Sequence, residues 1–399
     1  MALVVWGVGF LAAVAACGAG AGEPQPGGPS VAAGSWVPMA PSPLVARYGA
    51  QTVAVDGRVL VIGGLTTNPC PPNADCAYPA EAGRVDGALY DPASDTWESI
   101  ASAPIPIRYF QAAAVGHEVV VSADQPRRGR VQLMAYSVAD DAWRLLPDIP
   151  DGGPTWPSIA AGADETLLVF AGTHEEGRSA DLVLDLGRNE WRTLPPDPLP
   201  RGFDRSLVQA GSDLVLIEIP IAEVNSNGPA TYKAAVIEDG SGRWRVLDPS
   251  DIVGWDPTWL VVDGLVVNAS LGFVDGGEVN PYDSPLAVGG MLDPADGSWL
   301  PLPHAPVADS ASGRTPCLDR AVGDQQTIVA TTGFAWNLDT DVWQGVPKLP
   351  DGERVECGGA VVDGALVVWG GVQWRPRSGT SWADPQIMSN GWIWHPSSR

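Results

Sequence analysis

Residues 90–97 read YDPASDTW, and residues 292–299 read LDPADGSW. In both stretches a short polar turn lies between a β-forming residue and a tryptophan. The same setting recurs around five further tryptophans, Trp36, Trp143, Trp191, Trp244 and Trp343. Successive tryptophans of the set lie 61, 46, 48, 53, 55 and 44 residues apart. A period near 50 residues indicates a repeat protein, in which each repeat is one small unit of supersecondary structure.

A hairpin signal lies upstream of the tryptophan in several repeats. Residues 52–62 read TVAVDGRVLVI, and residues 359–369 read GAVVDGALVVW. Asp-Gly between two β-forming runs is a strong signal for a two-residue hairpin turn. Each repeat is therefore expected to contain four strands, a to d, with the repeated tryptophan on strand d.

These features resemble the kelch family over residues 35–396, in the period and in the position of the tryptophan. The double glycine that this family carries after strand b is present at Gly63-Gly64 and at Gly370-Gly371. The chain starts at Trp36 with a lone strand d and ends with strands a, b and c. We therefore predict an all-β fold, a seven-bladed kelch-type β-propeller of four-stranded blades whose last blade is closed by the N-terminal strand. A closed ring leaves no free sheet edges, and we expect a monomer.

The first 34 residues indicate export. Residues 3–16 are apolar, and the run is shorter than the roughly 20 residues that span a bilayer. Residues 14–17 read VAAC, which resembles the lipobox of bacterial lipoproteins, although no Lys or Arg precedes the apolar run. The resemblance implies a signal peptide over residues 1–17, a lipid on Cys17, a flexible tether over residues 18–34 and an extracytoplasmic, membrane-anchored protein. The alternative is an ordinary secretory signal that is removed together with Cys17.

The charge of the chain restricts its partners. The formal net charge is −24, and such an acidic surface repels phosphate backbones. We expect no nucleic-acid partner, and contact with a membrane only through the lipid anchor.

One face of the predicted ring is the better candidate for binding. Strands alternate in direction, so the b–c loops and the d–a connections share a face. The long b–c loops cover residues 66–84, 222–231, 272–286 and 373–387. Loops on a rigid scaffold commonly carry binding sites.

Arginines recur at the start of strand a, on that same face. Arg47, Arg314 and Arg354 lie nine residues before the a–b turn, Arg108 lies eight before it, and Arg201 is assigned to the same set. Arginines that converge on the channel mouth would suit a carboxylate or sugar-acid ligand. The alternative is that they neutralise neighbouring Asp and Glu side chains.

Four cysteines remain beyond Cys17, an even number for an oxidising compartment. Cys70 and Cys76 share the first long b–c loop, where a local disulfide is natural. Cys317 and Cys357 occupy equivalent places on the inner strands of neighbouring blades, and a bridge there would join the sixth blade to the seventh. The pairing stays open at this point. The four histidines, His117, His174, His304 and His395, lack the spacing of metal ligands, and no metal or cofactor is expected.

No catalytic motif stands out in the sequence. Our first hypothesis is a binding module that presents the b–c/d–a face to a protein, a peptide or a glycan. The second is an enzyme on sugars or sugar acids, similar to kelch-type epimerases and mutarotases, working at the arginine-lined mouth. Members of the galactose oxidase family need a Tyr–Cys crosslink and His ligands, for which this chain has no matching set. We therefore favour binding over catalysis.

Overall fold

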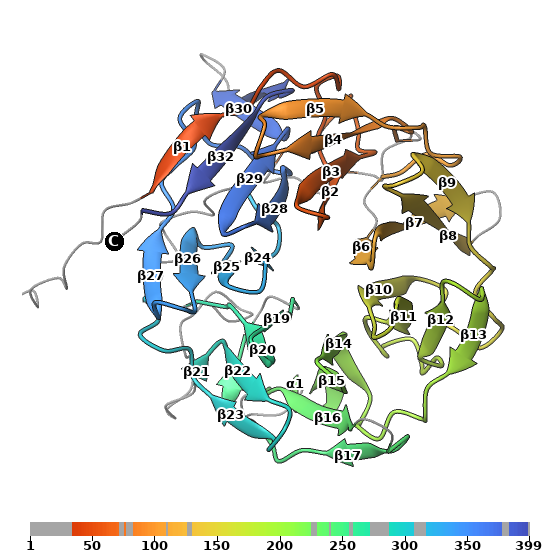
Figure 1. The fold of residues 1–399 in the computed structure, drawn as a ribbon. Helices are drawn as coiled ribbons and strands as arrows, with labels where there is room; N and C mark the ends of the chain where they lie inside the picture. The colour runs from red at the N-terminus through yellow and green to blue at the C-terminus, as the bar shows by residue number, and fades with distance from the viewer. Residues whose placement is uncertain are drawn as a thin grey trace, which may run out of the picture. The chain divides into compact units, whose positions relative to one another are not determined.

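The structure is a computed structural model that describes residues 34–71, 76, 83–108, 111–125, 130–224, 230–238, 241–254, 258–271, 287–306, 317–376 and 383–397. Residues 33–399 form one compact unit. Within the described part, seven antiparallel sheets of four strands each are arranged around a centre as the blades of a propeller (Figure 1). The predicted all-β, seven-bladed fold is confirmed.

The strands of the first four blades follow the order of the chain. The first blade contains β2 (Gln51–Val55), β3 (Arg58–Ile62), β4 (Gly87–Asp91) and β5 (Thr96–Ser99); the second β6 (Ala112–Val115), β7 (Glu118–Gln125), β8 (Arg130–Ser137) and β9 (Ala142–Leu145); the third β10 (Pro157–Ala161), β11 (Thr166–Ala171), β12 (Leu182–Asp185) and β13 (Glu190–Thr193); and the fourth β14 (Gly202–Ala210), β15 (Asp213–Pro220), β16 (Lys233–Ile237) and β17 (Trp244–Val246).

The last three blades complete the ring. The fifth contains β19 (Leu260–Val262), β20 (Leu265–Asn268), β22 (Gly290–Asp293) and β23 (Ser298–Leu300); the sixth β24 (Val322–Gly323), β25 (Thr327–Val329), β26 (Phe334–Asn337) and β27 (Val342–Gly345); and the seventh β28 (Gly358–Val362), β29 (Ala365–Trp369), β32 (Gly391–His395) and β1 (Ser35–Pro38). In the seventh blade β1 pairs with β32, with Trp36 opposite Trp394. The N-terminal strand therefore closes the last blade, as predicted.

Left-handed turns explain the tight a–b hairpins. Asp56 and Gly57 have φ angles of 49° and 70°, and Asp363 and Gly364 have φ angles of 49° and 74°. Two successive positive φ angles define a type I′ turn, whose twist matches that of the flanking strands. Asp tolerates this conformation and Gly adopts it freely, so the Asp-Gly pairs set the register of these hairpins.

The repeated tryptophans join neighbouring blades. All seven lie on fourth strands, and the indole N–H of Trp97 donates to the carbonyl of Ala40, 3.0 Å away, in the segment that follows the preceding blade's last strand. Trp143, Trp244, Trp299, Trp343 and Trp36 make the equivalent bond to Ala101, Pro195, Asp248, Pro303 and Pro347. These tryptophans thus serve the packing of one blade against the next, and all seven lie on strand d as predicted.

The hydrophobic core lies within and between the blades, because each sheet buries both of its faces against its neighbours. One cluster joins Val59 and Val61 of the first blade to Val367 and Trp369 of the seventh. Among the described residues, no helix combines the length and apolar character that a membrane crossing requires. The inner strands β28, β2, β6, β10, β14 and β19 contact one another in succession around the ring.

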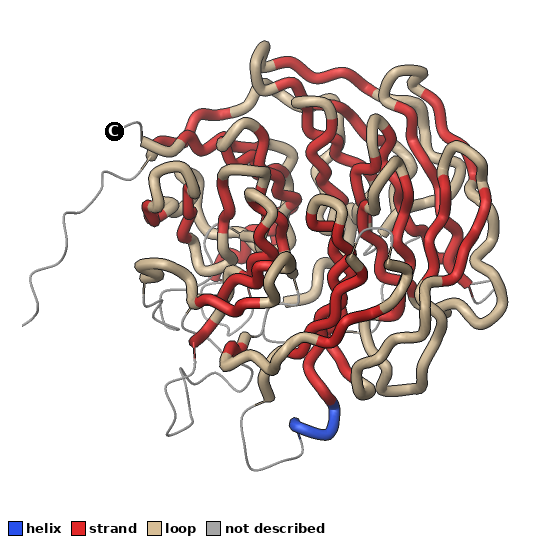
Figure 2. Tube along the Cα trace, turned by 60° about the horizontal axis from the view of Figure 1, so that its bottom comes forward, coloured by secondary structure: helices blue, strands red, loops and turns tan. Residues whose placement is uncertain are grey.

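Three small additions lie outside the blades. β18 (Ile252–Val253) pairs with β21 (Ala287–Val288), β30 (Val372–Pro376) pairs with β31 (Ala383–Ile387), and α1 (Ile221–Val224) follows β15. In Figure 2, α1 is the short helix that extends from the end of a strand. α1 and the β30–β31 hairpin both belong to b–c connections, so these additions thicken the face that the sequence predicted to carry binding.

Candidate functional site

Arg47 is held by structural contacts in the first blade. Its side chain is 0% exposed and forms an ion pair with Asp86 at 2.7 Å. It also donates to the carbonyl oxygen of Gly63 at 3.0 Å. Burial alone would raise the pKa of Asp86, but hydrogen bonds and positive charge from Arg47 and Arg84 outweigh it and lower that pKa to about 2. Arg47 therefore ties the end of strand b to the start of strand c.

Arg354 repeats this arrangement in the seventh blade. Its guanidinium donates to the carbonyl of Gly370 at 2.9 Å and to the side-chain oxygen of Asn390 at 3.0 Å. It also forms an ion pair with Asp351. Arg47 and Arg354 each lie four residues before their inner strand, and each binds the first glycine of a double glycine.

Of the other three predicted arginines, the structure describes two. Arg201 is exposed, and its guanidinium donates to the carbonyl of His174. Arg108 is nearly buried, four residues before β6, and Arg314 lies outside the described residues. Among the described residues, Arg47, Arg201 and Arg354 therefore bind carboxylate, amide or backbone oxygens of the fold. Ligand binding by Arg47, Arg108, Arg201, Arg314 and Arg354 stays a prediction.

Both disulfides lie on the b–c/d–a face. Cys70 pairs with Cys76 inside the first b–c loop, with 5.9 Å between their Cα atoms. Cys317 pairs with Cys357, 5.6 Å apart, and joins the connection before β24 to the residue before β28. These cysteines precede the inner strands rather than lie on them. The predicted local clip and the predicted bridge from the sixth blade to the seventh are both confirmed, whereas Cys17 lies outside the described residues.

A cavity of about 510 Å³ opens beside these disulfides. Its walls come from the first b–c loop, from the connections into the sixth and seventh blades, and from β30. They comprise Cys70, Cys317, Leu318, Asp319, Glu353, Arg354, Val355, Glu356, Val372 and Trp374. The lining thus combines apolar side chains with carboxylates, and its volume lies within the range of ligand pockets, about 300–1,000 Å³.

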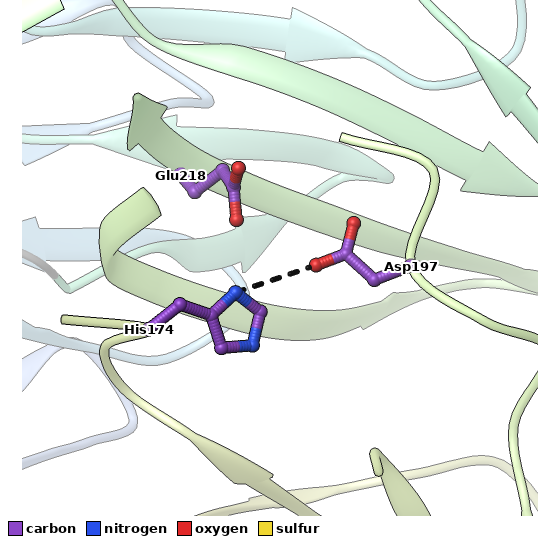
Figure 3. A group of neighbouring side chains, drawn as sticks. All are labelled: His174, Asp197 and Glu218. Atoms are coloured by element: carbon purple, nitrogen blue, oxygen red, sulfur yellow. Dashed lines mark ion pairs between the residues drawn. The ribbon is translucent and has the colours of Figure 1, made fainter. Parts of the chain in front are cut away.

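A second group of polar side chains is buried between the third and fourth blades. His174 lies between β11 and β12, Asp197 lies in the connection to β14, and Glu218 lies on β15 (Figure 3). Nδ1 of His174 is 3.8 Å from a carboxylate oxygen of Asp197. One ligand atom from each of the three residues lies within 4.8 Å of the others.

Arg205 holds the carboxylates of this buried group. Its side chain is 0% exposed and pairs with Asp181 at 2.9 Å, Asp197 at 3.0 Å and Glu218 at 3.1 Å. A β-bulge between Phe203 and Ser206 interrupts the pairing of β14 with β15 around it. Because a bulge re-aims a side chain, the bulge explains why an inner-strand arginine reaches into the space between two blades.

Burial dominates the electrostatics of the group. It raises the pKa of Glu218 to about 7, with a further increase from the negative charge of Asp197. It lowers the pKa of His174 to about 4, and the positive charges of Arg205, Arg178 and Arg201 act in the same direction. Burial also raises the pKa of Asp181.

Sequence reasoning missed this group. The three residues of Figure 3 are more than twenty positions apart along the chain, and no metal-binding motif includes them. Only the packing of the third blade against the fourth brings them together. His174, Arg201 and Arg205 are present in the sequence, but residues of these types at such spacing are not specific for a binding site.

Comparison with known proteins adds a partial relative. No protein-family model matches the chain. The kelch-like protein terF of Aspergillus terreus (strain NIH 2624 / FGSC A1156) is 28% identical over 184 residues, a match that covers 42% of this chain and 38% of terF. The chain therefore matches well under half of that relative's length. A solved structure, that of YjhT, superposes with a TM-score of 0.43 and 11% identity over 89% of this chain and 96% of YjhT.

Proposed function

We propose that this chain, a kelch-repeat β-propeller by its seven-bladed ring and its match to terF, is an exported and lipid-tethered binding module. Its b–c/d–a face would receive a segment of a protein or peptide partner. The observation that carries the proposal is the cavity beside the two disulfides. It lies on the face where the b–c loops and their additions gather.

The location of the protein is inferred from its cysteines. Disulfides persist in oxidising compartments, and both pairs of this chain have the geometry of a formed bridge. This supports an extracytoplasmic protein. The lipid anchor on Cys17 is proposed from the lipobox-like residues 14–17.

The lining of the cavity favours a peptide over a sugar acid. Arg354 is the arginine among its walls, and its terminal nitrogens already bind Asp351, Asn390 and the carbonyl of Gly370. Its guanidinium is therefore already paired with groups of the fold. Leu318, Val355 and Trp374 offer apolar contact, and carboxylates stand beside them, so a segment with apolar and basic side chains fits best.

The test is a thermal-shift screen of the full chain against three ligand sets: peptides with apolar and basic side chains, acidic peptides, and sugars with sugar acids. We expect the first set to raise the unfolding temperature. Trp374→Ala should weaken that binding about tenfold, which corresponds to about 1.4 kcal/mol for the loss of one aromatic anchor.

Two further variants complete the test. Trp156→Ala is the matched control, because Trp156 is exposed and does not line the cavity. Glu353→Gln is a milder change in the wall, for use where Trp374→Ala does not fold. A rise in unfolding temperature with sugar acids alone would contradict the proposal and favour the sugar-acid enzyme. Equal affinity of the wild type and both cavity variants for the peptides would also contradict it, because the cavity would then not be their binding site.

A further inference from the structure

The buried group around His174 contains polar atoms that the fold leaves without partners. The side chains of His174 and Glu218 are 1% and 0% exposed. Within the described part of the chain, neither ring nitrogen of His174 has a hydrogen-bond partner, and neither has Oε1 of Glu218. Burying such atoms without a partner costs free energy, so we expect a bound ligand to contact them.

The charges of the group indicate the sign of that ligand. Asp181, Asp197 and Glu218 are each 6% exposed or less and carry three negative charges when ionised. Within the part of the chain that the structure describes, Arg205 is the one cation of comparable burial that contacts them, so the buried carboxylates outnumber their buried cation. Arg178 also pairs with Asp197, at 3.2 Å, but its side chain is 40% exposed. Buried carboxylates with fewer buried cations favour a bound cation.

We propose that His174, Asp197 and Glu218 form a binding site for a divalent transition metal ion, with Zn²⁺ the best match. One imidazole nitrogen and two carboxylate oxygens are ligands that Zn²⁺ accepts, with bonds of about 2.0–2.2 Å. The three ligand atoms, within 4.8 Å of one another, would close in by roughly an ångström around such an ion. Water would complete its coordination.

Arg205 would position the ligands without binding the metal. Its Nε donates to Oε2 of Glu218, which leaves Oε1 of the same carboxylate for the ion. Outer contacts of this kind orient ligating groups and tune their affinity. A Cβ at Gly202 would lie 2.5 Å from Cδ of Glu218. A larger residue at this position would therefore push the Glu218 carboxylate out of place.

The site would also join two blades. His174 comes from the third blade, Glu218 comes from the fourth, and Asp197 comes from the segment between them. A cavity of about 420 Å³ is lined by Gly172 and Arg205 among others, so it reaches the arginine that holds the carboxylates. The site is separate from the cavity beside the two disulfides and does not depend on the proposed function.

The test is metal titration of the full chain after dialysis against a chelator. ZnCl₂ is titrated by calorimetry, and the unfolding temperature is measured with and without one equivalent. We expect one tight equivalent and a higher unfolding temperature. Zinc X-ray absorption should show nitrogen and oxygen ligands, with one imidazole and no sulfur.

Three variants make the test specific. Glu218→Gln keeps the shape of the side chain, and His174→Ala removes the imidazole; each should weaken binding of the tight equivalent at least about a hundredfold. His117→Ala is the matched control, since His117 is an exposed histidine 2.8 Å from Asp56, and it should bind as the wild type does. If His174→Ala does not fold, Glu218→Gln decides the outcome. Absence of a tight equivalent in the wild type, or its persistence in Glu218→Gln, would overturn the proposal.

Discussion

Removal of the Cys317–Cys357 bridge tests how the ring is held closed. The bridge joins two segments that are 40 residues apart and belong to neighbouring blades, whereas the Cys70–Cys76 bridge closes a separation of six residues. The perturbation is the double change Cys317→Ser and Cys357→Ser. Its reference is the double change Cys70→Ser and Cys76→Ser, which removes the same atoms from a local loop.

The separation of the cysteines sets the expected magnitudes. A disulfide restricts the unfolded chain, and the loop-closure entropy grows with the logarithm of the loop length. For a separation of 40 residues this amounts to about 4 kcal/mol at 25 °C, and for six residues to about 2 kcal/mol. The Cys317–Cys357 pair should therefore contribute about twice as much to the free energy of unfolding as the Cys70–Cys76 pair.

The assay is equilibrium unfolding in urea, followed by tryptophan fluorescence and by circular dichroism. Coincident transitions by the two methods justify a two-state analysis. The reasoning fails if loss of Cys70–Cys76 costs as much as loss of Cys317–Cys357. Such a result would place the contribution of the bridges in the native state rather than in the entropy of the unfolded chain.

Three further changes probe the ring and the anchor. Arg47→Met should cost about 3 kcal/mol in urea unfolding, because it leaves a carboxylate and a carbonyl without their buried partner; a loss below about 1 kcal/mol would contradict the role assigned to it. The pKa of Asp86 in the folded protein, about 2, lies below its ordinary 3.8, so this group stabilises the fold above pH 4. About 1 kcal/mol of that stability, after solvent screening, should be lost as the pH falls from 4 to 2, and the Arg47→Met variant should lose less in a pH series. Trp97→Phe removes an inter-blade hydrogen bond, whereas the indole N–H of Trp191 has no partner in the described structure. Trp97→Phe should therefore lower the free energy of unfolding, measured by thermal unfolding, by about 1 kcal/mol more than Trp191→Phe does. Equal losses in the two variants would argue against the bond. Cys17→Ser should release the protein from the membrane fraction on cell fractionation, and continued retention would exclude the lipid anchor.

The period of the tryptophans carried most of the fold prediction. A blade is a local unit in which four consecutive strands pair in order, so its signals lie within about 50 residues of each other. The Asp-Gly hairpins and the tryptophan turns are both of this kind. The closing of the last blade by β1 also followed from the sequence, because an incomplete unit at each end leaves one arrangement in which no edge is exposed.

The arginines show where such reasoning stops. Their position four residues before the inner strand could be derived from the repeat, and Arg47 and Arg354 lie there. The partners of these side chains could not be derived. Asp86 is 39 residues from Arg47, and Asn390 is 36 residues from Arg354, so the fold alone decides that these guanidinium groups are bound within their blades.

By itself the sequence determined the number of blades, the strand that bears each repeated tryptophan and the closure of the ring, and it suggested the two cysteine pairs that the structure confirms. All of these depend on local periodicity or on equivalent positions in successive repeats. Only the tertiary structure decided that His174, Asp197 and Glu218 meet around Arg205. These residues come from three connections or strands of different types, and a bulge in β14 turns the arginine toward them. Neighbouring blades pack face to face, so the contacts between them link residues that no sequence period relates.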